Sequence, residues 1–116
     1  MATFLIVDDH ARFRALVSTL LKEEGHEVVG EAAGGSAGLD AARRLAPDVV
    51  LLDVHLPDVS GFEVASRIAS GQDGPAVWLT STHDGSDYER LARRNGARGF
   101  VPKQDLSAHS IRQLAG

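Results

Sequence analysis

Apolar residues gather in five short runs along the chain. Longer segments separate the runs, and in these the apolar positions recur every three or four residues. The runs cover residues 3–7, 27–32, 48–52, 76–80 and 99–101. The third is apolar at the consecutive positions 49–52, which is typical of a strand buried on both faces. We therefore expect five strands, and Pro102 directly after the last one indicates an edge strand, because proline cannot donate to a ladder on both sides.

The segments between the runs have the period of helices. In the first, apolar side chains recur at i, i+3, i+4, i+7 and i+8, namely Phe13, Leu16, Val17, Leu20 and Leu21. This spacing predicts a helix whose apolar stripe faces the core and which ends at Gly25. Ser60 with Glu63, and Ser86 with Glu89, have capping-box spacing and predict two further helix starts. The remaining expected helix ranges are 36–46, 60–71, 86–95 and 107–114.

Strands that alternate with helices predict an α/β fold with a parallel sheet covered on both faces. We expect a doubly wound (βα)5 domain with right-handed crossovers, formed by residues 1–116 as a single unit. No second domain fits within a chain of 116 residues.

Charge and composition narrow the classes of function. The chain has 12 Lys and Arg against 16 Asp and Glu, a net charge of −4, which disfavours direct binding of nucleic acid. It has no cysteine, which excludes a disulfide framework and a thiolate metal site. The first apolar run breaks at Asp8, far short of a signal peptide or a membrane span, so we expect a cytoplasmic protein that does not contact membranes.

Polar residues follow the expected strands where a parallel α/β sheet binds its ligands, beyond the carboxyl ends. These residues are Asp8 and Asp9 after the first strand, Asp53 after the third, Thr80 and Ser81 after the fourth, and Lys103 after the fifth. Crowded carboxylates need a proton or a cation, and Mg²⁺ prefers carboxylate oxygens. An aspartate can also accept a phosphoryl group, which a lysine and a hydroxyl can then bind. The set predicts phosphoryl transfer to an aspartate.

The same residues carry a resemblance to a known family. The DD pair after the first strand, LLDVHLPDVSG around Asp53, the hydroxyls that end the fourth strand and GARGFVPK resemble the receiver domains of two-component response regulators. The resemblance covers essentially the whole chain. With DDH at the start, it is most similar to receivers that precede helix-turn-helix output domains. It implies a flavodoxin-like strand order, 2-1-3-4-5.

The resemblance implies a role for each acidic residue. Asp53 would be the phosphoacceptor. Asp9, Asp53 and the backbone carbonyl of His55 would bind Mg²⁺ directly, and Asp8 would act through a water molecule. Lys103 would contact the phosphoryl group.

The switch residues are also implied by the resemblance, and one of them has two candidates. Phe100 would be the aromatic residue that reorients on phosphorylation. Spacing counted back from Lys103 selects Ser81 as the switch hydroxyl, whereas spacing counted forward from Pro75 selects Thr80. We prefer Ser81, because an extra residue is then placed in the loop before the strand.

The histidines and the residue after the lysine leave several points open. His55 and His83 lie two positions past the acceptor and the preferred hydroxyl, where this family tunes the lifetime of the phosphoryl group; they are equally well explained as loop histidines without a role. We expect structural roles for His10 and His26. Gln104 replaces a proline that often follows the lysine in this family.

The resemblance further implies partners. A sensor histidine kinase or a phosphotransfer protein would supply the phosphoryl group, and the face of helix 4, strand 5 and helix 5 would support a homodimer. The domain would signal rather than act as an enzyme, catalysing only its own phosphorylation and autodephosphorylation. Two alternatives are a pseudo-receiver that only binds proteins and a phosphatase of the haloacid dehalogenase type. The latter needs an acid two residues after its nucleophile, where this chain has His55.

Overall fold

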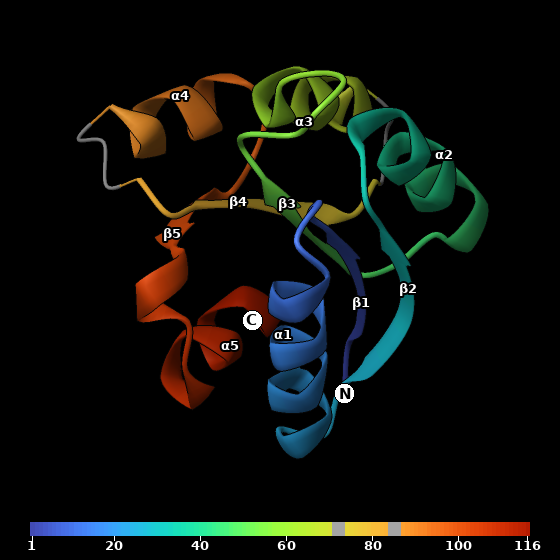
Figure 1. The fold of residues 1–116 in the computed structure, drawn as a ribbon, viewed down its shortest axis with the longest axis vertical. Coiled ribbons are helices and arrows are strands. Elements are labelled where there is room, and N and C mark those ends of the chain that lie inside the picture. Colours follow the sequence, from blue (N-terminus) through green and yellow to red (C-terminus); the bar gives the residue numbers. More distant parts are fainter. Residues whose placement is uncertain (71–73, 84–86) are drawn as a thin grey trace.

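The structure is a computed structural model that describes residues 1–70, 74–83 and 87–116. The described residues form one five-stranded parallel sheet with the order β2-β1-β3-β4-β5, as expected for this fold (Figure 1). The strands are β1 (Thr3–Val7), β2 (Glu27–Ala32), β3 (Val49–Asp53), β4 (Ala76–Ser81) and β5 (Gly99–Pro102). Each bound lies within one residue of the bound expected from the sequence, and β5, which contains Pro102, is an edge strand.

Helices cover both faces of the sheet, with α1 and α5 on one side and α2, α3 and α4 on the other (Figure 1). Their bounds are α1 (Ala11–Glu23), α2 (Gly35–Leu45), α3 (Gly61–Ala69), α4 (Tyr88–Arg94) and α5 (Ala108–Ala115), with a short 3-10 helix, η1 (Lys103–Asp105), after β5. The expected end of the third helix near Gly71 and the expected cap at Ser86 lie outside the described residues. Within the described ranges, no helix is both long and apolar enough to cross a membrane.

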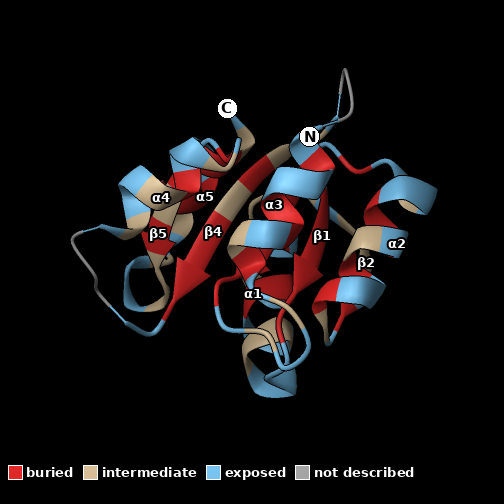
Figure 2. Ribbon diagram, turned by 90° about the horizontal axis from the view of Figure 1, so that it is seen from above, coloured by how far each residue is buried: buried red, intermediate tan, exposed pale blue. Residues whose placement is uncertain are grey.

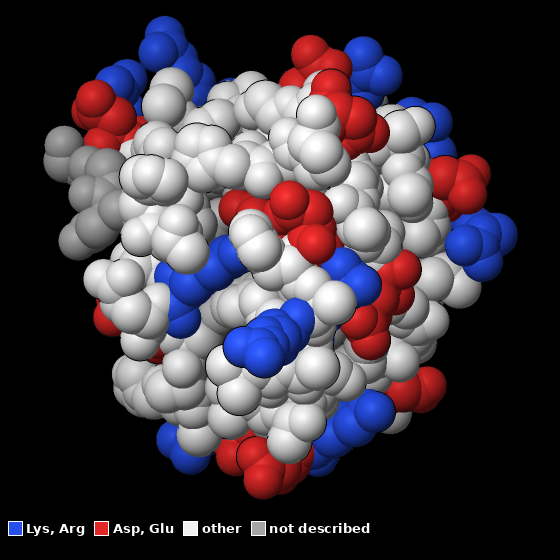
Figure 3. Space-filling view, viewed as in Figure 1, with Lys and Arg blue, Asp and Glu red and all other residues white. Residues whose placement is uncertain are grey.

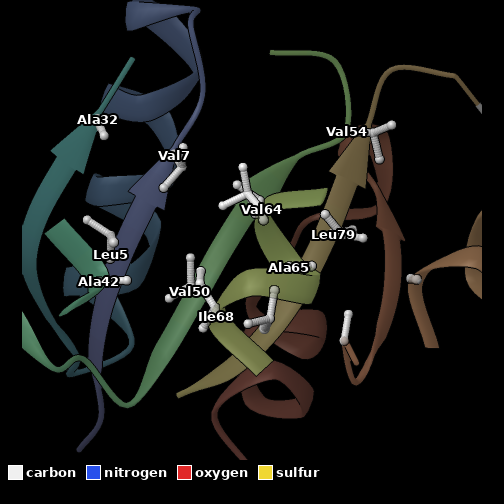
Figure 4. Packing of buried hydrophobic residues seen from close by; sticks show 14 of the residues in the cluster. Leu5, Val7, Ala32, Ala42, Val50, Val54, Val64, Ala65, Ile68 and Leu79 are labelled. Carbon is white, nitrogen blue, oxygen red and sulfur yellow. The ribbon is translucent and has the colours of Figure 1, made fainter. Parts of the chain in front are cut away.

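Successive strand residues point to opposite faces, and this alternation divides the core into two clusters. Leu5, Val50 and Leu79 pack under α2, α3 and α4, whereas Ile6 and Leu51 pack under α1 and α5. Figure 4 shows the first cluster, and Figure 2 shows that β1 and β4 are mostly buried while the outer faces of the helices are exposed. Burial on both faces explains the continuous apolar run that predicted β3.

The apolar stripe expected on the first helix is partly wrong. Val17 and Leu21 are buried as expected, but the Leu16 side chain is 68% exposed. The inward face of α1 is centred on Val17, Ser18 and Leu21, and a step of about 100° per residue turns Leu16 away from that centre. The apolar pattern therefore predicted a wider buried stripe on α1 than the structure has.

The caps of the helices agree with the sequence only in part. The Ser60 hydroxyl accepts a hydrogen bond from the Phe62 N–H at 3.2 Å, but the Glu63 carboxylate pairs with Arg67 at 3.1 Å instead of returning to the cap. At α5, by contrast, Ser107 and Ser110 form a reciprocal capping box.

Candidate functional site

The acidic residues meet beyond the carboxyl ends of β1 and β3. Asp8 is fully buried, Asp53 is 3% exposed, and Asp9 is exposed. Asp53 follows Leu51 by two positions and Asp8 follows Ile6 by two, so both lie on the α1 side of the sheet. Parallel strands end at the same edge, which is why carboxylates far apart in the sequence come together.

Lys103 places its ammonium group between these carboxylates. Its Nζ lies 2.7 Å from Asp8 Oδ2 and 3.5 Å from Asp53 Oδ2, and the side chain is 10% exposed. The same Nζ lies 4.2 Å from the centroid of the Phe13 ring on α1, a cation–π contact. The lysine is thus held on the α1 side by one ring and two buried charges.

Burial is the largest influence on the pKa of Asp53. Loss of hydration raises its pKa above the ordinary value, and the nearby negative charge of Asp8 raises the pKa further. The His55 N–H, which donates to Asp53 Oδ1 at 3.2 Å, and the Lys103 ammonium act in the opposite direction. Since burial is the largest contribution, the ionised carboxylate is short of stabilising partners, and a further cation would supply one.

A group of ligand atoms that could hold such a cation comes from Asp8, Asp9, His10 and Asp53, whose ligand atoms all lie within 4.8 Å of one another. Three carboxylates of this kind fit a hard ion such as Mg²⁺. We expected only a structural role for His10, but its Nδ1 lies 3.1 Å from an oxygen of Asp8 and from one of Asp9. His26 is structural as expected, since its Nδ1 accepts the Ala2 N–H at 3.0 Å.

The two candidate switch hydroxyls point to different sides of the sheet. Thr80 pairs with Asp53 in the ladder and follows Trp78, so it shares the α1 side; among the described residues its buried hydroxyl has no hydrogen-bond partner. Ser81 ends β4, follows Leu79 of the opposite cluster, and its hydroxyl accepts the His83 N–H at 3.0 Å. The choice between them remains a prediction.

Aromatic side chains line the other side of the site. The Tyr88 ring at the start of α4 lies 5.3 Å from the Phe100 ring and 5.8 Å from the Phe62 ring, both edge to face. Its hydroxyl lies 3.1 Å from His55 Nε2, and the His55 ring lies 5.0 Å from that of His83. His55, Phe62 and Tyr88 also line a cavity of about 460 Å³ that reaches Asp9. These rings form an aromatic cluster that joins α4 to the loop after Asp53. The sequence did not predict that Tyr88 would contact His55, Phe62 and Phe100.

The loop after β3 is fastened to α2 by Asp58. Its carboxylate accepts the N–H groups of Gly35 and Ser36 at 2.8 and 3.0 Å, and these two bonds lower the pKa of Asp58. A methyl group at Gly35 would overlap Val59, and one at Gly61 would overlap the carbonyl oxygen of Asp53. Both glycines are therefore required by close approach to this loop.

The acidic residues of the site are also visible on the surface of the molecule. In the view of Figure 3, a group of acidic atoms lies near the middle of the molecule, and basic atoms lie directly beside it. One of the basic residues near the site is Arg14, which no sequence motif indicated. Its guanidinium donates a hydrogen bond to the backbone carbonyl of Asp8.

The fold, the acidic cluster and the buried lysine define a receiver-type α/β domain, and comparison with known proteins agrees. The sequence profile of the response regulator receiver domain matches residues 4–114. The chain therefore belongs to the response regulator receiver family, and domains of this family signal within regulators rather than act as enzymes in their own right.

Several of its relatives are transcription regulators. The chain is 38% identical over 101 residues to the virulence transcription regulator BvgA of Bordetella pertussis, covering 87% of this chain and 48% of BvgA. It is 39% identical over 99 residues to the transcriptional regulatory protein PdtaR of Mycobacterium tuberculosis, covering 85% and 48%. The chain thus spans about half the length of these relatives.

A solved structure of similar sequence has the same fold. The signal receiver domain of the response regulator NarL from Mycobacterium tuberculosis is 35% identical, with a TM-score of 0.88 over 97% of this chain and 90% of that one. A CheY in complex with CheX, BeF3 and Mg from Borrelia burgdorferi, at 23% identity and a TM-score of 0.86, supports the fold alone.

Proposed function

We propose that this chain is the phosphoacceptor domain of a response regulator and that Asp53 receives the phosphoryl group. The observation that carries the proposal is the environment of that carboxylate. It is buried at the strand end, its pKa is raised by burial, and the Lys103 ammonium lies 3.5 Å away. A buried carboxylate beside a single cation suits an oxygen that is to carry more negative charge.

The donor is a phosphohistidine on a sensor histidine kinase or a phosphotransfer protein. An Asp53 oxygen attacks the phosphorus, the P–N bond breaks, and the histidine nitrogen keeps the bonding pair and later takes a proton. Hydrolysis of the resulting acyl phosphate returns the carboxylate and releases inorganic phosphate. Lys103 needs little movement to contact the new oxygens, because its ammonium already lies between Asp8 and Asp53.

The residues present fit a Mg²⁺ ion. Asp9, Asp53 and the backbone carbonyl of His55 would hold it directly, and Asp8 would hold it through water. When bound, the ion supplies positive charge that stabilises the phosphoryl oxygens. The chain's own contribution is to hold Asp8 and Asp53 close together beside Lys103.

The response to phosphorylation is proposed to pass to the aromatic cluster. Ser81, with Thr80 as the alternative, would donate a hydrogen bond to the phosphoryl group and draw the end of β4 toward it. Phe100 would then reorient, and its present edge-to-face contact with Tyr88 on α4 would change. The face of α4, β5 and α5 would change shape and could form the contact in a homodimer.

The lifetime of the phosphoryl group is proposed to depend on His55 and His83. Both side chains are exposed, and their rings lie 5.0 Å apart beside the acceptor loop. They can therefore limit or orient the water that hydrolyses the acyl phosphate.

The relatives of the chain also support a proposal about the larger protein in which it acts. We propose that residues 1–116 form one receiver domain that acts in the cytoplasm and controls an output segment. The transcription regulators among its relatives, about twice its length, support this proposal. The receiver itself does not bind nucleic acid, because its net charge is −4.

Incubation with a small phosphodonor and Mg²⁺ tests the acceptor. The intact wild-type protein should gain the mass of one phosphoryl group, Asp53→Asn should gain none, and Asp105→Asn, an exposed acid of η1, should behave as wild type. An unmodified wild type, or equal labelling of Asp53→Asn, would contradict the proposal. An unmodified wild type that also fails to bind Mg²⁺ would favour the pseudo-receiver alternative.

A further inference from the structure

Arg14 closes the turn that carries the first two acidic residues. This turn, Asp8 to His10, joins β1 to α1 and is only three residues long. The Arg14 backbone N–H donates to the His10 carbonyl at 3.1 Å, and the Arg14 guanidinium Nη1 donates to the Asp8 carbonyl at 2.6 Å. One residue of the helix therefore binds both ends of the turn.

The bond to the Asp8 carbonyl replaces a bond of the sheet. The Asp8 N–H still donates to the Ala32 carbonyl of β2 at 2.9 Å, so the backbone is held up to that nitrogen. Beyond it the chain leaves the sheet, and among the described residues only Arg14 donates to the Asp8 carbonyl. The guanidinium fixes the peptide plane between Asp8 and Asp9, from which both carboxylates project.

Glu31 at the end of β2 holds the guanidinium in this position. Arg14 Nε lies 3.0 Å from Glu31 Oε1, and the exposed fractions of the two side chains are 19% and 42%. A guanidinium can make both bonds because its donors form a rigid fork, whereas a lysine ammonium of the same charge cannot reproduce both directions. The turn is thus tied to β2 through a side-chain relay.

We propose that Arg14 is a positioning residue for the metal site: it sets the direction of the Asp8 and Asp9 carboxylates through the backbone and does not touch the ion. The inference rests on the proposed Mg²⁺ site. Loss of positioning and loss of charge would change the affinity for Mg²⁺ in opposite directions. Loss of a positive charge near an acidic site would strengthen binding of Mg²⁺ by Coulomb attraction, whereas loss of positioning weakens it.

Titration with Mg²⁺, followed by the fluorescence of Trp78, the single tryptophan, or by calorimetry, decides between these effects. Arg14→Ala should raise the Kd for Mg²⁺ roughly tenfold, as loss of a supporting hydrogen bond does at other metal sites. Arg14→Lys should raise the Kd by a smaller factor, and Glu31→Gln by a smaller factor still. Arg12→Ala, an exposed arginine of the same helix turn, should leave the Kd unchanged.

Thermal unfolding in EDTA separates positioning from general damage. The inference requires that Arg14→Lys stays folded with a melting temperature near that of wild type while its Kd rises; this variant and Glu31→Gln decide if Arg14→Ala does not fold. A Kd that is unchanged or lower in the folded variants overturns the role of Arg14 and leaves the proposed site intact. A wild type that does not bind Mg²⁺ overturns the proposed site, and the role of Arg14 with it.

Discussion

At the carboxyl ends of the strands, the two faces of the sheet carry different kinds of side chain. On the α1 side lie Asp8, Asp53 and Lys103, all nearly buried and all charged or able to be charged. On the α3 and α4 side lie Tyr88 and Phe100, which touch through their rings and are only partly buried. The first side is held by ion pairs at low exposure, the second by packing of aromatic rings.

This difference shows how one edge can combine charge and movement. Electrostatic interactions are strong at low dielectric, so the charged side is sensitive to any added charge. Ring contacts are weaker and tolerate rotation, so the aromatic side can change its packing at low cost. Thr80 and Ser81 are neighbours in sequence yet belong to different sides, because successive strand residues alternate.

Removal of the central cation should have the largest effect. Lys103→Met keeps the length of the side chain but leaves Asp8 and Asp53 buried without it, and we expect a loss of about 2–3 kcal/mol in unfolding free energy in EDTA. Mg²⁺ should restore much of this loss, since it can replace the missing charge. Urea denaturation with and without Mg²⁺ measures both quantities.

Lys22→Met, at the exposed end of α1, is the matched control and should change stability by less than about 0.5 kcal/mol. Equal losses for the two lysine variants would mean that the charged side is not held by its ion pairs.

Removal of the acceptor charge should have a smaller and opposite effect. Because burial raises the folded pKa of Asp53 above its ordinary value of 3.8, ionisation costs stability as the pH rises from that value through the raised pKa. Asp53→Asn removes this cost, so in EDTA at neutral pH it should be more stable by about 1 kcal/mol. The gain should disappear below the ordinary pKa, where the wild-type carboxyl is protonated in both states.

Thermal unfolding across the pH range, with wild type and Asp53→Asn in parallel, checks the sign. A gain that is independent of pH would attribute the effect to packing rather than to charge. Mg²⁺ should reverse the order at neutral pH, since only the wild type keeps the full set of carboxylates.

The smallest effect is expected on the aromatic side. Tyr88→Phe removes the hydroxyl that lies 3.1 Å from His55 Nε2 but keeps the ring contacts, so stability should change by less than about 0.5 kcal/mol. The imidazole resonances of His55 should shift in NMR spectra, while those of the remote His109 should not. A loss as large as that of Lys103→Met would show that this side depends on its polar contact rather than on packing.

Much of the fold was predictable because its signals are local. The apolar run before Asp53 identified a doubly buried strand, and Pro102 identified an edge strand, since both depend on the backbone of their own segment. The DD pair and Asp53 could be assigned to one edge because parallel strands leave their carboxyl ends together. The width of the buried face of a helix was less predictable, because Leu16 fits the apolar pattern but is exposed.

The sequence alone determined the order of the elements, the edge at which the polar residues collect and the family to which the chain belongs. Only the tertiary structure decided that Arg14 bonds to the Asp8 carbonyl, that Asp58 ties the β3–α3 loop to α2, and that Tyr88 meets His55. The reason is physical: these contacts join segments that no periodicity relates, and their geometry is set by how whole helices pack on the sheet.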